Sequence, residues 1–161
     1  MKKKLSLLLV VLLLAITFTS CTYVDEFMDI IGEDPIEETS EKLGEIDPDG
    51  RYTSKEDVAL YIHNYGELPK NFISKGEAKN KGWNSSDGNL WEVTEEKSIG
   101  GDIFGNREGN LPEKDGRQYY EADIDYDGGY RGAKRIVYSN DGLVYYTDDH
   151  YETFTLLYGD E

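Results

Sequence analysis

The second half of the chain contains side chains whose types suit the cleavage of a phosphodiester. Glu121 lies in the sequence QYYEADIDY, Arg131 and Arg135 in GYRGAKRI, and His150 in TDDHYETF. In-line cleavage needs a base that takes a hydroxyl proton and an acid that protonates the leaving oxygen. Arginines suit the phosphate between them, because a planar guanidinium matches two oxygen atoms. The combination indicates an acid–base site for a phosphate ester.

The elements that must position these residues begin with helices. A first helix is predicted between Ser54, a good N-cap, and Gly66, a stop signal, because apolar residues recur between them on one helical face. Ser74 repeats the start signal for a second helix over about 75–81. A third, short helix is predicted over 89–93.

The remainder of the chain has the alternating pattern of strands. An Asp-Gly step at 141–142 predicts a hairpin turn. The expected strands cover residues 98–104, 118–126, 135–139, 143–147 and 151–158. Helices followed by an antiparallel sheet predict an α+β domain.

This arrangement gives each candidate residue a predicted place. Alternation puts Glu121 on the strand face opposite Tyr120, and Arg135 starts the next strand, so both are expected on one face of the sheet. His150 falls in the turn before the last strand. Lys75 falls in the first turn of the second helix, within reach of the sheet.

Each residue taken singly has a simpler interpretation. Glu121 alone fits a solvent-facing strand position, and His150 alone fits a turn. Arg131 and Arg135 fit ion pairs with carboxylates, which isolated cations among many acids usually form. The other histidine, His63, is expected on the exposed side of the first helix with a structural role.

Residues 1–21 are predicted to direct export. Lysines at 2–4 precede an apolar run over 5–16 that is too short to span a membrane, as in a secretory signal peptide. Small residues lead into Cys21, the only cysteine, and this end resembles the lipobox of bacterial lipoproteins, in which the cysteine is lipidated. Ordinary signal cleavage is the alternative. Both predict an extracellular protein, secreted or anchored to the outer face of a membrane.

Residues 22–50 form a strongly acidic segment, with eleven acidic residues and one basic residue. Two prolines and few apolar residues leave this segment little to bury, so it is expected to be a linker or pro-segment. From Arg51 the apolar pattern becomes periodic. A single domain over 51–161 is therefore expected.

Five blocks of sequence resemble one known family. In order, they are GELPKNFISKGEAKNKGW, KSIGGDIFGNREGNLP, GRQYYEADIDY, GYRGAKRIVYS and DHYETFT. Over about residues 54–156 they are similar to the barnase-like, secreted, guanyl-preferring bacterial ribonucleases. The resemblance implies the α+β microbial ribonuclease fold, with N-terminal helices packed on a C-terminal antiparallel sheet.

The resemblance also implies cleavage of RNA without a metal or other cofactor. By resemblance, Glu121 takes the proton of the ribose 2′-hydroxyl and His150 protonates the departing 5′-oxygen, which leaves a 2′,3′-cyclic phosphate. Lys75, Arg131 and Arg135 would hold the phosphate. The residue types agree, because carboxylates with a reference pKa of about 4.3 are ionised near neutrality, whereas imidazoles near 6.5 still hold a proton in part.

The resemblance places guanine recognition in one loop, at Phe104, Asn106, Arg107 and Glu108. Backbone groups would meet the base edge, and the Glu108 carboxylate would accept from its two adjacent donors. Tyr151 is expected to lie against a base or to help position the phosphate. Gly105 stands where the family has serine.

The charge of the chain conflicts with RNA binding. The formal net charge is −16, and residues 51–161 alone carry 22 acidic and 13 basic side chains. Such a field repels polyanions at long range. Two interpretations remain: a ribonuclease with a local basic cleft, or a surface-anchored acidic binding module on a ribonuclease scaffold. The expected partners are RNA and a barstar-like inhibitor protein, with membrane attachment through Cys21 and a monomeric domain.

Overall fold

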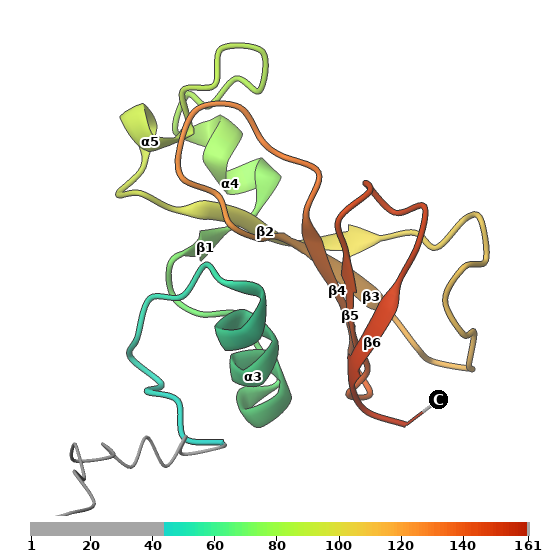
Figure 1. Ribbon diagram of the computed structural model, residues 1–161. Coiled ribbons are helices and arrows are strands. Elements are labelled where there is room, and N and C mark those ends of the chain that lie inside the picture. Colours follow the sequence, from blue (N-terminus) through green and yellow to red (C-terminus); the bar gives the residue numbers. More distant parts are fainter. Residues whose placement is uncertain (1–43, 161) are drawn as a thin grey trace, which may run out of the picture. The chain divides into compact units, whose positions relative to one another are not determined.

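Helices precede strands in the computed structural model, which describes residues 44–160 (Figure 1). The predicted signal segment 1–21, with Cys21, and most of the acidic segment 22–50 lie outside the described residues. No helix within residues 44–160 is long and apolar enough to cross a membrane. The elements are α3 (Lys55–Tyr65), β1 (Phe72–Ile73), α4 (Lys75–Asn80), α5 (Leu90–Val93), β2 (Ser98–Phe104), β3 (Tyr119–Asp123), β4 (Arg135–Ser139), β5 (Val144–Thr147) and β6 (Thr155–Tyr158).

The predicted helix starts are confirmed by their capping contacts. The Ser54 side chain accepts a hydrogen bond from the Asp57 backbone N–H at 3.1 Å, and α3 ends at Gly66 with a left-handed φ of 70°. Glycine suits that position because it has no Cβ to clash. Ser74 and Glu77 form a full capping box at the start of α4. These local contacts place the first residue of α4, Lys75.

The strands form one six-stranded sheet in the order β1-β2-β3-β4-β5-β6. All neighbouring pairs are antiparallel except β1 and β2, which are parallel. The α+β class with a C-terminal antiparallel sheet is therefore confirmed, and the structure adds one short parallel strand, β1, at the edge of the sheet. Two residues are too few to show periodicity, so β1 is invisible in the sequence.

The last strand is shorter than predicted. β6 covers Thr155–Tyr158 instead of residues 151–158. His150 and Tyr151 have φ values of 61° and 77°, in the left-handed region, where a strand cannot form. Residues 150–151 therefore belong to a turn that precedes β6.

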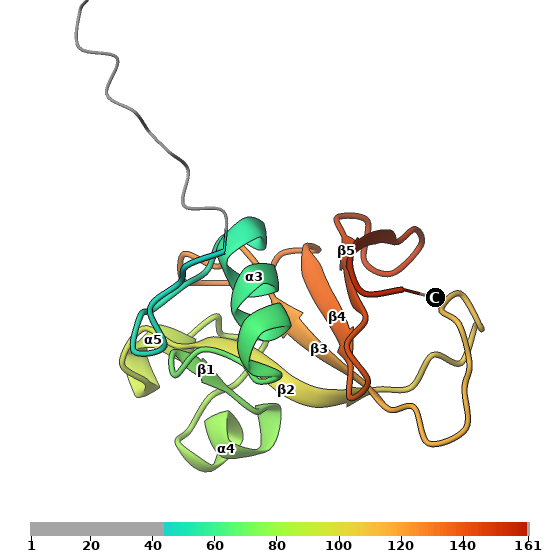
Figure 2. The ribbon, with the colours of Figure 1, turned by 90° about the horizontal axis from the view of Figure 1, so that it is seen from below.

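The two faces of the sheet have different coverings. Helix α3 packs on one face, where Val58 and Ile62 meet residues of β3, β4 and β5 such as Ala122 and Ile136 (Figures 1 and 2). The other face holds a second cluster, Leu111, Tyr119, Val137, Leu143 and Tyr145, against which Phe104, Tyr151 and Phe154 pack. Alternation puts Glu121 on this second face, because it lies directly opposite Val137. The candidate site therefore lies on the face away from α3.

The described residues begin at Gly44 and so include some that precede Arg51. Residues 44–50, here called the N-terminal strap, are held by side chains of α3. The Tyr61 hydroxyl donates to the Pro48 carbonyl at 2.9 Å, and the Tyr65 hydroxyl donates to the Ile46 carbonyl at 2.7 Å. The end of the acidic segment is therefore part of the fold.

Replacing Tyr61 with Phe is expected to lower the free energy of unfolding by about 1 kcal/mol, because one hydrogen bond to the strap is lost while the buried ring stays. Urea unfolding of the parent and the variant measures this difference. Equal stability of the two proteins would mean that the strap does not dock on α3 in solution.

Candidate active site

Glu121 lies at the centre of the face that α3 leaves free. It comes from the middle of β3 and is 6% exposed, so the solvent-facing alternative does not apply. Its carboxylate accepts hydrogen bonds from the Lys75 ammonium and the Tyr151 hydroxyl. Burial by itself raises the pKa of Glu121, but these hydrogen bonds and the charges of Lys75 and Arg131 together lower it. Glu121 is therefore ionised at neutral pH.

Lys75 reaches Glu121 because α4 is anchored to the sheet. The Asp102 carboxylate of β2 accepts a hydrogen bond from the Lys75 backbone N–H at 2.8 Å. Asp102 lies opposite Glu121, just after an irregularity in the β2–β3 register where Gly101 has a φ of 89°. A bulge of this kind re-aims the side chains that follow it, and it needs glycine for its backbone. Sequence periodicity does not predict such an anchor.

Asp123 organises both arginines and was not among the predicted site residues. Its carboxylate binds the Arg131 guanidinium through two contacts of 2.6 Å, and the Arg135 Nε lies 3.0 Å away. Asp123 is 2% exposed and Arg135 is 3% exposed. Alternation carried two residues beyond Glu121 would have placed Asp123 on the same face, directly opposite Arg135. The arginines are thus ion-paired, as the simpler interpretation expected, and they still border Glu121.

Tyr151 connects the Glu121 carboxylate with the Arg135 guanidinium. Its hydroxyl donates to Glu121 and accepts from the Arg135 Nε at 3.2 Å. Burial and then the hydrogen bond to Glu121 raise the pKa of Tyr151. The His150 imidazole lies beside it, with 4.9 Å between the ring centroids, and is exposed. Lys75, Glu121, Arg131, Arg135 and Tyr151 are therefore brought together by direct contacts or through Asp123, and His150 borders them.

The predicted base loop lies next to this group. Phe104 packs against Tyr151 with 5.1 Å between ring centroids. The Asn106 side chain closes the loop, because it donates to the Leu111 carbonyl at 2.9 Å and accepts from the Leu111 N–H at 3.0 Å. Its backbone, with φ at 39°, is left-handed. The Asn106 side chain is thus engaged within the loop.

The other two loop residues, Arg107 and Glu108, are exposed. A Cβ added at Gly105 would lie 3.6 Å from atoms of the Arg107 side chain, an ordinary contact distance. Gly105 also lacks a positive φ. The serine that the resemblance implies at this position would therefore fit without strain, so the glycine is not demanded by the shape of the loop.

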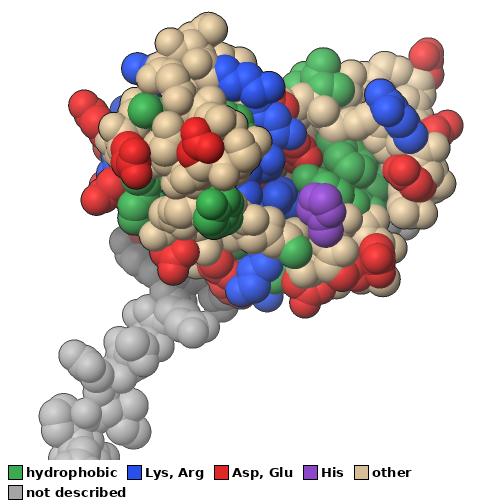
Figure 3. Space-filling model, turned by 90° about the horizontal axis from the view of Figure 1, so that it is seen from above, with side chains coloured by type: hydrophobic (Ala, Val, Ile, Leu, Met, Phe, Trp, Pro, Cys, Tyr) green, Lys and Arg blue, Asp and Glu red, His purple; other side chains and the backbone are tan. Residues whose placement is uncertain are grey.

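The surface over this group is hollowed and basic. Figure 3 shows Lys and Arg side chains inside a hollow, with a histidine and a hydrophobic patch at its edge and acidic side chains around the outside. Lys134 pairs with Asp125 at 2.7 Å, not with Glu121 or Asp123. Cationic side chains are thus gathered in a hollow of a domain whose net charge is acidic.

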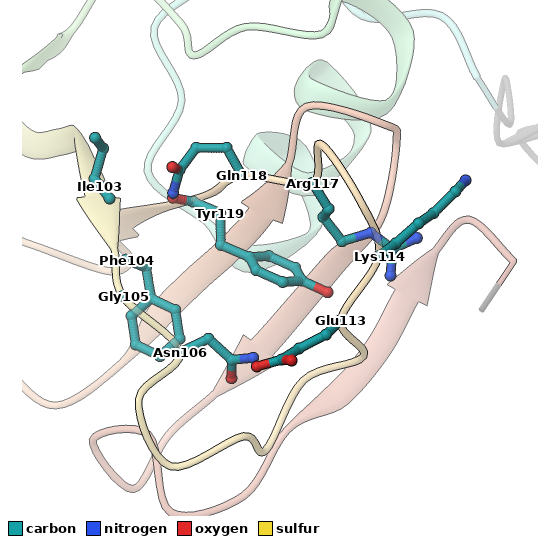
Figure 4. Close-up of a pocket in the computed structure, with 9 residues that line it drawn as sticks. All are labelled: Ile103, Phe104, Gly105, Asn106, Glu113, Lys114, Arg117, Gln118 and Tyr119. Carbon is teal, nitrogen blue, oxygen red and sulfur yellow. The ribbon is translucent and has the colours of Figure 1, made fainter.

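A separate pocket of about 340 Å³ lies between the base loop and the start of β3 (Figure 4). Phe104 and Asn106 line it together with charged side chains from the 113–117 segment, including Arg117, which is held by Asp141 at 2.9 Å. Glu121, His150 and the site arginines do not line this pocket. The pocket therefore does not coincide with the group around Glu121.

Within the described residues, no group of three or more His, Cys, Asp or Glu side chains is arranged to hold a metal ion.

Comparisons with known proteins agree with the fold. A family model described as ribonuclease matches residues 55–158. A ribonuclease of Bacillus intermedius is 55% identical over 100 residues, which cover 62% of this chain and 62% of that protein. A ribonuclease of Heyndrickxia coagulans is 54% identical over 100 residues and 92% of its length. Guanyl-specific ribonuclease St of Saccharopolyspora erythraea is 44% identical over 57 residues, or 35% of this chain and 56% of that protein.

The chain belongs to the ribonuclease family, and the resemblance inferred from its sequence blocks is confirmed. Its matched part spans 62% of the length of the Bacillus intermedius relative.

Proposed function

We propose that the protein is an endoribonuclease that cleaves single-stranded RNA after guanosine by transesterification through a 2′,3′-cyclic phosphate. The observation that carries this proposal is a buried, ionised carboxylate, Glu121, held by a cation on the face where two arginines and a histidine also converge. An ionised base, a cationic phosphate clamp and an imidazole acid are the groups that the reaction requires. Membership of the ribonuclease family supports the same conclusion.

The proposed division of roles follows from the environments of the two groups. Glu121 is ionised and enclosed beside the phosphate clamp, so its carboxylate is free of a proton and can accept that of the 2′-hydroxyl. His150 is exposed at the edge of the cleft, where the leaving 5′-oxygen of a long polymer has access. Hydrolysis of the cyclic phosphate would then use the same pair with the roles exchanged.

Phosphate binding is proposed to exchange partners within an existing network. Lys75 pairs with Glu121, and Arg131 and Arg135 pair with Asp123. A phosphate that enters between them offers further acceptor oxygens to the same donors. The guanidinium groups are already oriented, so little side-chain entropy is lost when the phosphate binds.

Guanine preference is proposed for the loop that contains Phe104, Asn106, Arg107 and Glu108. The printed name of the Saccharopolyspora erythraea relative, a guanyl-specific ribonuclease, supports this specificity. The adjacent packing of Phe104 on Tyr151 supports a base site next to the phosphate site. Export through residues 1–21, lipidation of Cys21 and recognition by a barstar-like inhibitor are part of the proposal on sequence grounds alone.

Incubation of the purified protein with single-stranded RNA in EDTA is expected to give fragments that end in guanosine 2′,3′-cyclic phosphate. Mapping of the 3′ ends and mass spectrometry of the fragments measure this result. Cleavage only in the presence of an added metal ion would contradict the mechanism. Intact RNA would favour the second candidate, an acidic binding module on the same scaffold, which the net charge of −16 supports.

A further inference from the structure

The loop between β5 and β6 carries the proposed acid in an unfavourable backbone conformation. His150 and Tyr151 are consecutive, neither is glycine, and their φ values are 61° and 77°. Residues other than glycine are uncommon in this left-handed region, although asparagine, aspartate and histidine are enriched there, and a bulky residue such as Tyr151 persists in it only where surrounding contacts enforce it. The contacts that enforce this conformation therefore also set the position of the His150 ring.

One carboxylate supplies most of these contacts. Asp149 Oδ1 accepts from the Thr147 hydroxyl at 2.8 Å and from the backbone N–H groups of Glu152 and Thr153, both at 3.0 Å. Its Oδ2 accepts from the Thr153 hydroxyl at 2.6 Å. The carboxylate thus bridges Thr147, ahead of the loop's strained pair, and the two residues after that pair.

Thr147 connects this carboxylate to the strained pair itself. The hydroxyl that donates to Asp149 accepts from the Tyr151 backbone N–H at 3.1 Å. Thr147 is buried at the end of β5, so the chain of contacts is attached to the sheet. Asp149, Thr147 and Thr153 together are called the loop clasp.

The loop clasp also fixes the geometry on the far side of Tyr151. That residue's hydroxyl donates to Glu121, and its ring contacts both His150 and Phe104 of the base loop. A change in the backbone at 150–151 would move the proposed acid relative to the proposed base. Displacements of about 1 Å between reacting groups lower rates on the order of 10²-fold.

We infer that Asp149 is a positioning residue for catalysis, whose carboxylate holds His150 and Tyr151 in the left-handed conformation that places the imidazole at the cleft. The inference rests on the proposed ribonuclease function. Asp149 itself makes no proton transfer, because its two oxygens are taken up by the four donors of the loop. The pKa of Asp149, lowered to about 2 chiefly by the Thr153 hydroxyl, agrees with a carboxylate that stays ionised across the working pH range.

The direct test replaces Asp149 with Asn, which keeps the shape but turns one acceptor oxygen into a donor. We expect kcat on a guanosine-containing dinucleotide to fall by ~10- to 100-fold, with KM within threefold of the parent. The matched control is Asp148→Asn, which removes the same charge from the exposed neighbouring residue and is expected to leave kcat unchanged. A decrease of less than threefold in kcat for Asp149→Asn overturns the inference.

A milder pair of variants keeps the test valid if Asp149→Asn folds poorly. Thr153→Val removes the hydroxyl that donates to Asp149, and Thr153→Ser retains it. We expect Thr153→Val to lower kcat and Thr153→Ser to restore it to near the parent value, with similar melting temperatures for the two. Equal kcat values for Val and Ser overturn the inference.

The backbone conformation gives a measurement that does not depend on activity. In the parent protein, the intraresidue HN–Hα distances of His150 and Tyr151, measured from nuclear Overhauser effects, should be short, as positive φ requires, and Asp149→Asn should shift them. If the parent does not cleave RNA but Asp149→Asn still produces this shift, the proposed function is refuted and the loop clasp remains as a structural feature. A parent that cleaves RNA, together with an unshifted and fully active Asp149→Asn, refutes the inference alone.

Discussion

Replacing Glu121 with Gln is expected to lower kcat/KM for RNA by roughly 10²- to 10⁴-fold, the range that a general base contributes. The amide keeps the volume of the buried side chain but cannot take a proton from the ribose hydroxyl. Initial rates on a short guanosine-containing oligonucleotide measure the effect. Asp125→Asn is the matched control, because it removes a carboxylate from an exposed position just after β3.

His150→Ala belongs to the same prediction and is expected to produce a loss of similar size for substrates with a poor leaving group. A substrate whose leaving group needs no protonation, such as a nitrophenyl ester of guanosine 3′-phosphate, should be cleaved by His150→Ala at a rate closer to that of the parent. Glu121→Gln should stay slow on both substrates, since the nucleophile must still lose its proton. If His150→Ala cleaves RNA like the parent, another residue is the acid.

Replacing Asp123 with Ala is expected to lower the free energy of unfolding by about 3–5 kcal/mol. The change leaves the Arg135 guanidinium, which is 3% exposed, without its buried counter-charge, and unpaired buried charges are costly. Arg131 loses the same partner. Urea unfolding at neutral pH, with kcat/KM for RNA measured in parallel, checks the prediction.

A surface pair provides the comparison for Asp123. Asp49 pairs with Lys70 on the exposed strap, so Asp49→Ala is expected to leave stability nearly unchanged, because exposed ion pairs contribute little. A loss for Asp123→Ala of no more than 1 kcal/mol would mean that water or other side chains compensate the arginines, and that Asp123 is not their organising group.

The helices show how far local sequence determines structure. Ser54, Gly66 and Ser74 specify where α3 begins, where it ends and where α4 begins, because capping contacts join residues three or four apart in the chain. Strand β4 likewise matches its prediction over 135–139. By contrast, β1 and the true start of β6 at Thr155 depend on partners distant in sequence, and sequence periodicity missed the first and misplaced the second.

The candidate site shows the same division. The residue types and blocks of sequence indicated Glu121, His150, Lys75 and both arginines, and alternation placed Glu121 on the correct strand face. The sequence did not indicate that Asp123 holds both arginines or that Asp102 anchors Lys75. These contacts cross between strands or between a helix and the sheet, so the pattern along the chain carries little information about them.

The sequence by itself determined the family, the α+β class, the caps of the first two helices and the kinds of group available for chemistry. Only the tertiary structure decided that Glu121 is buried and ionised, that the arginines are held by a shared carboxylate, and that His150 and Tyr151 take left-handed conformations. The physical reason is the distance along the chain between the residues that interact. Propensity and capping act over a few residues, whereas burial and ion pairing arise only when the folded sheet brings distant segments together, and the left-handed pair is held partly by such a distant contact, from Tyr151 to Glu121.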